Sequence, residues 1–246
     1  MSMFRLRRHS RGLGLSPRRR AAKGAGLPII VQDGLVAEWR FDDGSGQVLT
    51  DYSGNGNHGT LGANSGSSTD DPTWTAQGLS FDGGDFVSFA DNLGISGTQA
   101  RTVIFVADTA SLNRFAVEWI GDGGAGRRWT FRDQGSGDEL RLEISGAGYT
   151  SALAPTGALR FMACTQSGAN INTGVIYLDG VAEAITTSAL INTIGNFSIG
   201  TLIGVSYHTA TVAYGLVYNR ALSAAEIAQN RQALKTILAA RGVTLP

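Results

Sequence analysis

The chain has 246 residues, of which 42% are hydrophobic and 16% charged, with 34 glycines but only five prolines. This length suits one large all-β sandwich or two small domains. Frequent glycine without frequent proline is typical of short strands joined by tight turns, and it excludes a collagen-like or disordered chain. The only cysteine, Cys164, excludes an intramolecular disulfide; it lies in a strand-like run, so we expect a small buried side chain.

The sequence also bears on the compartment in which the protein folds. It contains no stretch of about 18 apolar residues that would span a membrane. The basic N-terminus is not followed by the hydrophobic segment of a secretory or twin-arginine signal. We therefore expect folding in a cytoplasm and no membrane partner.

Charge is segregated along the chain although the formal net charge is zero. Residues 1–26 carry eight basic side chains and no acid, whereas the remainder carries twelve basic and twenty acidic residues, a net charge of −8. This segment lacks helical or strand periodicity and has too few apolar residues for a core. We predict an extended anchoring arm, disordered alone and ordered only along a partner. Its basic residues are Arg5, Arg7, Arg8, Arg11, Arg18, Arg19, Arg20 and Lys23.

Two kinds of partner fit the arm. Eight positive charges would bind nucleic acid through its phosphates. They would equally bind an acidic protein surface, including other copies of this chain. Because the arginines are not interleaved with aromatic residues that stack on bases, we favour protein.

Residues 27–222 alternate short apolar segments with glycine, asparagine and aspartate, which predicts an antiparallel sandwich of about ten or eleven strands. Residues 35–41 and 139–144 alternate as half-buried strands do. Residues 103–107 are continuously apolar, as in a strand covered on both faces. Asp179-Gly180 suits the type I′ turn of a hairpin.

One helix is predicted near the C-terminus, within a third segment of residues 223–246. Ser223 and Glu226 form a capping box, and Gly242 follows a helix that should run to about Arg241. Its apolar stripe either packs on the sandwich or, in its second half (residues 234–238), contacts a neighbouring subunit.

Four segments together resemble the laminin-G-like, concanavalin-A-like jelly-roll modules of bacterial surface proteins and phage structural proteins. They occur in the family's order and cover most of the chain. They are residues 35–46 (LVAEWRFDDGSG) with 51–59 (DYSGNGNHG), 79–87 (LSFDGGDFV), 177–180 (YLDG), and 197–200 (FSIG) with 217–227 (VYNRALSAAEI). The resemblance implies a two-sheet jelly roll. Residues 213–216 depart from an acidic pair frequent in the family, and neither the arm nor residues 232–246 belong to the module.

Family members often hold a structural calcium ion, which makes several oxygen-bearing side chains candidates here. Turn stabilisation is the alternative role for the same side chains, and no other cofactor is expected. The candidates are Asp51, Asn55, Asn57, Asp82 and Asp85.

Signatures of catalysis are absent from the sequence. Glucanases of this fold use alternating carboxylates on one strand, but Arg141 separates Glu139 from Glu143 and should neutralise both. The glycine-rich residues 121–126 precede a strand-like segment and not the helix that a dinucleotide site requires. The three histidines and Cys164 have no zinc-ligand spacing. We therefore expect no enzyme.

These observations favour a phage virion protein, a head decoration or a tail or fibre subunit assembled in the host cytoplasm. The arm would anchor it to other virion proteins and to copies of itself, and the lectin-like sandwich would be displayed, with a surface glycan as a further partner. Two alternatives stay open: a free-standing bacterial carbohydrate-binding module and, less favoured, a glycosidase.

Overall fold

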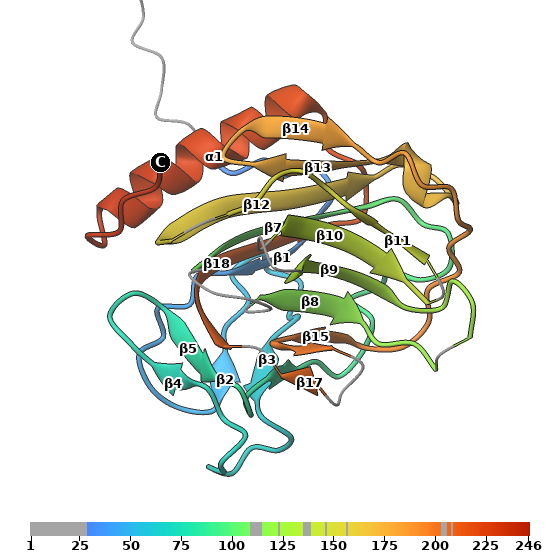
Figure 1. The fold of residues 1–246 in the computed structure, drawn as a ribbon. Helices are drawn as coiled ribbons and strands as arrows, with labels where there is room; N and C mark the ends of the chain where they lie inside the picture. Colours follow the sequence, from blue (N-terminus) through green and yellow to red (C-terminus); the bar gives the residue numbers. More distant parts are fainter. Residues whose placement is uncertain are drawn as a thin grey trace, which may run out of the picture.

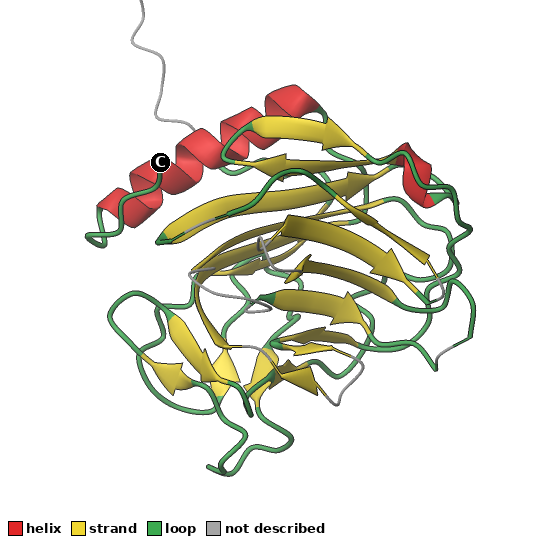
Figure 2. Cartoon of the chain, in the orientation of Figure 1, coloured by secondary structure: helices red, strands yellow, loops and turns green. Residues whose placement is uncertain are grey.

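In the computed structural model, two antiparallel β-sheets pack face to face and an α-helix lies outside one of them (Figure 1). The structure describes residues 29–108, 115–122, 124–134, 139–145, 147–155, 157–202, 206–207 and 209–246. Strands far outnumber helices in this part of the chain (Figure 2). This architecture confirms the predicted jelly-roll sandwich with a C-terminal helix. The predicted arm lies outside the described residues.

Sheet I carries the helix on its outer face and has eight strands. In spatial order, with β1 pairing to β18 off the main path, they are β14 (Val181–Ala184), β13 (Gly174–Leu178), β12 (Leu159–Gln166), β7 (Arg101–Asp108), β18 (Thr209–Tyr218), β5 (Leu79–Asp82), β4 (Thr73–Trp74) and β1 (Leu35–Trp39). The β13–β14 hairpin turns at Asp179 and Gly180, both at positive φ, as predicted for an Asp-Gly turn.

Sheet II also has eight strands, and its outer face is rich in polar side chains. In spatial order they are β11 (Ala147–Thr150), β10 (Glu139–Ile144), β9 (Trp129–Gln134), β8 (Ala116–Trp119), β15 (Phe197–Ile199), β6 (Val87–Ser88), β3 (Gly59–Leu61) and β2 (Val48–Leu49). A two-stranded ribbon, β16 (Thr201–Leu202) and β17 (Ser206–Tyr207), and a 3₁₀ turn, Ile171–Thr173, complete the elements besides the helix.

The main core lies between the sheets, and a second core lies between sheet I and the helix. Strand β7 contributes to both, with Val103 and Phe105 on one side and Ile104 and Val106 on the other. All four side chains are fully buried, as the continuous apolar run predicts. Cys164 is also fully buried, and burial raises the pKa of its thiol.

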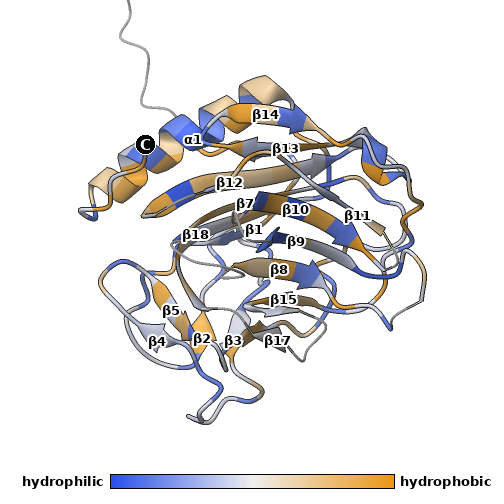
Figure 3. Cartoon of the chain, viewed as in Figure 1, coloured by the Kyte–Doolittle hydropathy of each residue, from blue (hydrophilic) through white to orange (hydrophobic). Residues whose placement is uncertain are grey.

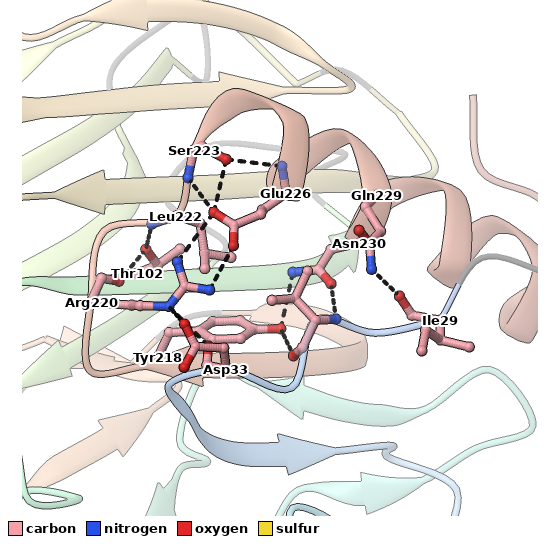
Figure 4. Close-up of polar contacts among 11 residues, drawn as sticks. Ile29, Asp33, Thr102, Tyr218, Arg220, Leu222, Ser223, Glu226, Gln229 and Asn230 are labelled. Atoms are coloured by element: carbon pink, nitrogen blue, oxygen red, sulfur yellow. Dashed lines mark hydrogen bonds and ion pairs between the residues drawn. The ribbon is translucent and has the colours of Figure 1, made fainter.

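Helix α1 (Ala224–Ala239) begins at the predicted capping box. The Ser223 hydroxyl accepts a hydrogen bond from the Glu226 amide, and the Glu226 carboxylate accepts one from the Ser223 amide. Arg220 forms an ion pair with the same carboxylate at 2.6 Å (Figure 4). The helix packs its Leu234 and Leu238 on sheet I, so both leucines are fully buried in this chain.

The described chain enters the fold alongside α1. The Val31 amide donates to Asn230 Oδ1 at 2.8 Å, and Asn230 Nδ2 donates to the Tyr218 hydroxyl at 3.0 Å. That hydroxyl donates to the Val31 carbonyl at 3.0 Å, which closes the ring of contacts seen in Figure 4. Gln229 adds a bond to the Ile29 carbonyl. The first described residues therefore lie beside α1.

Two expectations differ from the structure. The described residues form eighteen strands, because several are only two or three residues long and carry no readable alternation. Strand β1 was expected to be half-buried, yet Glu38 on its polar face is only 7% exposed. The Tyr214 hydroxyl donates to Glu38 Oε1 at 2.5 Å, and Arg241, beyond α1, donates to the Arg40 carbonyl. These long-range partners cover the strand's second face.

Candidate functional site

Three calcium candidates, Asp51, Asn55 and Asn57, lie in the loop between β2 and β3, where they bond backbone groups of the loop and of β1. The Asp51 carboxylate accepts hydrogen bonds from the amides of Glu38 (3.0 Å), Ser53 (2.9 Å) and Asn57 (2.9 Å). Asn55 Nδ2 donates to two carbonyl oxygens at the start of β1, at 3.0 and 3.1 Å. These contacts are those of turn-stabilising side chains.

The other two candidates lie in the turn between β5 and β6. The Asp82 amide donates to Asp85 Oδ2 at 2.7 Å, and the Gly84 amide donates to Asp82 Oδ1 at 3.0 Å. Asp85 is 3% exposed. Burial raises the pKa of its carboxyl to about 6, and the negative charges of Asp82 and Asp71 act in the same direction.

The fold keeps these two groups of candidates apart. The loop with Asp51 precedes β3, whereas Asp85 lies beyond the far end of β3, because Leu61 pairs with Val87. Within the described ranges, no group of three or more His, Cys, Asp or Glu side chains is arranged to hold a metal ion. A calcium ion at these residues stays a prediction.

The carboxylates considered for hydrolysis lie on the outer face of sheet II, where β8, β9 and β10 carry hydrophilic segments (Figure 3). The Glu143 carboxylate forms the predicted ion pair with Arg141, whose Nε lies at 3.1 Å, and it forms two more with Arg128 and Arg132. Burial opposes ionisation of Glu143, but the three arginines outweigh it and lower its pKa. Glu139 forms no ion pair with any described residue. A carboxylate held ionised in this way is unsuited to act as a general acid.

A groove of about 450 Å³ lies beside β2, β3 and β4, at the opposite side of the molecule from α1 in Figure 1. One wall consists of the glycine-rich segment that leads into β2, and the other of the polar loop that leads into β4. Its lining residues are Gly44, Ser45, Gly46, Gln47, Leu61, Ser67, Ser68, Asp71, Pro72, Thr73 and Trp74.

Among the described residues that line this groove, Trp74 is the only aromatic one. It is half-buried against the core, and its Nε1 donates to the Gly46 carbonyl at 2.9 Å, which fixes the indole. Asp71 is held by the Ser68 amide, which donates to its Oδ2 at 2.7 Å. Gln47 Oε1 is buried in the wall without a hydrogen-bond partner among the described residues. The groove thus combines a fixed aromatic surface with a carboxylate acceptor, Asp71.

This combination suits a ligand that is apolar on one face and carries hydroxyl groups at its edges. An indole packs against C–H groups, and carboxylate and amide oxygens accept hydrogen bonds from hydroxyls. The sequence interpretation missed Trp74. A usable signal was present, because residues 64–73 form a loop of small and acidic residues with a tryptophan directly after it.

The two eight-stranded antiparallel sheets define the class of protein as a jelly-roll sandwich. The chain belongs to the concanavalin A-like lectin/glucanases superfamily, whose family model matches residues 81–228. The family predicted from the sequence motifs is therefore confirmed. No curated protein matches the sequence.

Several solved structures share the fold. The sialidase of Trypanosoma rangeli is 16% identical with a TM-score of 0.60, over 91% of this chain and 36% of its own. Domain 4 of AbnA, an extracellular GH43 arabinanase from Geobacillus stearothermophilus solved with arabinotriose, is 18% identical with a TM-score of 0.58, over 81% of this chain and 98% of its own. The binding domain of Paraclostridial Mosquitocidal Protein 1 is 14% identical with a TM-score of 0.56, over 80% of this chain and 51% of its own.

These likenesses establish the fold alone. The chain spans about a third of the length of the sialidases that it matches. The fold therefore occurs both within enzymes and in binding domains.

Proposed function

We propose that this protein is a non-enzymatic carbohydrate-binding domain whose glycan site is the Trp74 groove. The observation that carries the proposal is the fixed indole of Trp74 beside the Asp71 carboxylate in an open groove of about 450 Å³. A pyranose or furanose ring has this pattern, with C–H groups on a face and hydroxyls around the rim. The arabinotriose-bound neighbour of the same fold supports this ligand class.

The absence of catalysis is part of the proposal. Glu143 is engaged by three arginines that keep it ionised, so it is not available to protonate a leaving group. Glycoside turnover by the purified protein, lost in Glu139→Gln or Glu143→Gln, would contradict this part. We expect no turnover on any glycan that the protein binds.

A glycan array probed with the full chain tests the site. We expect saturable binding to a subset of glycans, about fivefold to thirtyfold weaker in Trp74→Ala, because loss of a stacking aromatic costs about 1–2 kcal/mol. Leu190→Ala is the matched control, since Leu190 is 73% exposed and does not line the groove. No binding by the wild type, or equal binding by Trp74→Ala, would overturn the assignment.

For the whole chain we propose a structural subunit of a phage virion, a head decoration or a tail or fibre appendage. The basic arm anchors it to other virion proteins or to copies of itself, and the sandwich displays the groove toward host glycans. The charge contrast between arm and body supports this role. So does the position of α1 and Ile29 on one side of the molecule and of the groove on the other (Figure 1).

A further inference from the structure

A second pocket lies on the outer face of sheet II, along the paired strands β6 and β15 and the end of β8. Its volume is about 310 Å³, and among the described residues it shares no lining residue with the Trp74 groove. Because Val87 and Ile199 point into the core between the sheets, the adjacent Ser88 and Ser198 point outward. The two serines lie directly opposite each other in the β6–β15 pair. The pocket therefore lies on the face of the sandwich that α1 does not cover.

Apolar side chains form the two ends of this pocket. Ile120 follows β8, and its amide donates to the Asn196 carbonyl at 2.9 Å, which places Ile120 beside the start of β15. Phe86 precedes β6, so the antiparallel register places it beside the other end of β15. Both side chains are partly exposed, whereas Phe89 and Phe197, which also line the pocket, are buried in the main core. An apolar ligand group can therefore be buried here against a rigid support.

Hydrogen-bonding groups lie between these ends. Ser198 and Thr201 are each 2% exposed, and their hydroxyls have no hydrogen-bond partner among the described residues, which is costly for buried groups. Asn196 is exposed, and its Nδ2 donates to the carbonyls of Phe89 and Ala90. These two bonds fix the amide and leave its Oδ1 as an accessible acceptor. The pocket thus offers hydroxyls that can donate and an amide oxygen that can accept.

The described residues that line the pocket carry no charge. Glu118, which lies opposite Ser198 on β8, is fully buried and is not part of the lining. A charged ligand group would lose its water here without gaining an ion pair, which disfavours ammonium and carboxylate groups alike. The volume is at the lower end of the range for small-molecule sites. The pocket therefore suits a small neutral ligand that carries an apolar group, a donor and an acceptor.

We propose that this pocket is a second glycan site and that it binds the acetamido group of an N-acetylated amino sugar. An acetamido group has a methyl for the apolar surface of Ile120, a carbonyl for the Thr201 hydroxyl and an N–H for Asn196 Oδ1. A simple hexose lacks the apolar substituent, and a free amino sugar carries a charge that the pocket does not pair. The choice of a saccharide rests on the proposed carbohydrate-binding function, whereas the preference for an acetamido group rests on the lining of the pocket.

Titration of the full chain with methyl glycosides, followed by saturation-transfer NMR, tests the proposal. We expect N-acetylglucosamine or N-acetylgalactosamine to bind about tenfold more tightly than its parent hexose and than its free amino sugar. A tenfold difference corresponds to about 1.4 kcal/mol, which is the size expected for burial of one methyl group and formation of one hydrogen bond. The strongest saturation transfer should reach the acetamido methyl.

Three variants examine the lining. Thr201→Val conserves the shape of the side chain and removes its hydroxyl, so binding of the acetamido sugar should weaken about twofold to tenfold. Thr193→Val is the matched control, because the Thr193 hydroxyl is also buried and unpartnered among the described residues but does not line the pocket. It should leave binding unchanged. Ile120→Ala removes apolar wall and should reduce the preference for the acetamido sugar over its parent hexose.

The outcomes separate this pocket from the groove. Trp74→Ala should keep the preference for acetamido sugars, whereas Thr201→Val should keep binding to glycans that lack the group. Equal affinities for N-acetylated and parent sugars, or a preference unchanged in both Thr201→Val and Ile120→Ala, would overturn the second site and leave the groove standing. Equally tight binding of an N-acetyl-lysine peptide would overturn the saccharide assignment. Absence of binding to every glycan would overturn the proposed function and this inference with it.

Discussion

At the residue scale, Asp85 makes stability depend on pH in an unusual direction. Its pKa is about 6 in the folded protein against an ordinary 3.8, because burial and the neighbouring charge of Asp82 disfavour the ionised form. Well below pH 3.8 the carboxyl is protonated in both the folded and the unfolded protein, so it does not change the free energy of unfolding. Between pH 4 and 6 only the unfolded chain releases the proton, so this residue's contribution to stability falls as pH rises.

Asp85→Asn should remove that slope. The amide oxygen can still accept from the Asp82 amide, while the buried charge disappears. We expect the variant to be more stable than the wild type by up to about 3 kcal/mol at pH 7 and nearly equal to it at pH 4. Urea unfolding at both pH values measures the difference. The exposed Asp33→Asn serves as control and should retain the wild-type slope; a slope retained by Asp85→Asn would contradict the pKa assignment.

Single residues also mark the limit of the sequence interpretation. The capping box and the Asp-Gly turn were predictable because their partners lie within three residues of each other. Trp74 acquires its role from the Gly46 carbonyl, 28 residues away. The convergence of Arg128 and Arg132 on Glu143 depends on strand register, which no local pattern specifies.

At the element scale, α1 is joined to the entering chain by one buried amide. Asn230 is fully buried, and it bonds both Val31 and Tyr218. Asn230→Ala leaves the Val31 amide and one lone pair of the Tyr218 hydroxyl without partners inside the protein. We expect a loss of about 2–3 kcal/mol in the free energy of unfolding.

Chemical denaturation measures this loss, and Gln229→Ala is its control. Gln229 lies next to Asn230 on the helix but bonds the Ile29 carbonyl from an exposed position. Its removal should cost less than about 0.5 kcal/mol. Equal costs for the two variants would show that the buried amide does not hold the helix to the entering chain.

The elements themselves were more predictable than their number. Strands with clear alternation, such as β10, appear where the sequence placed them because one face is buried and the other polar. Two-residue strands such as β2 and β4 are defined by their pairing with other strands. They are too short to show the alternation of apolar and polar residues from which a strand is predicted. The predicted helix ends at Ala239, two residues before the expected end, and Gly242 takes the positive φ of a helix stop.

At the scale of the whole molecule, two hydrophobic cores determine how the folded body, the sandwich with its helix, can be oriented relative to an assembly. One core joins the two sheets, and the other fixes α1 and the entering chain on the outer face of sheet I. Attachment through the arm would therefore place α1 toward the assembly. The groove beside β2 and β4 would then face outward (Figure 1).

Deletion of residues 1–24 tests this division between anchor and body. The deletion leaves Val31 and its contacts with Asn230 and Tyr218 in place, so thermal unfolding of the body should change by less than a few degrees. Glycan binding should also persist, because the groove lies within the retained residues. Only incorporation into the purified particle should be lost. Incorporation at the wild-type level would remove the arm's anchoring role, whereas an unfolded body would mean that the arm belongs to the fold.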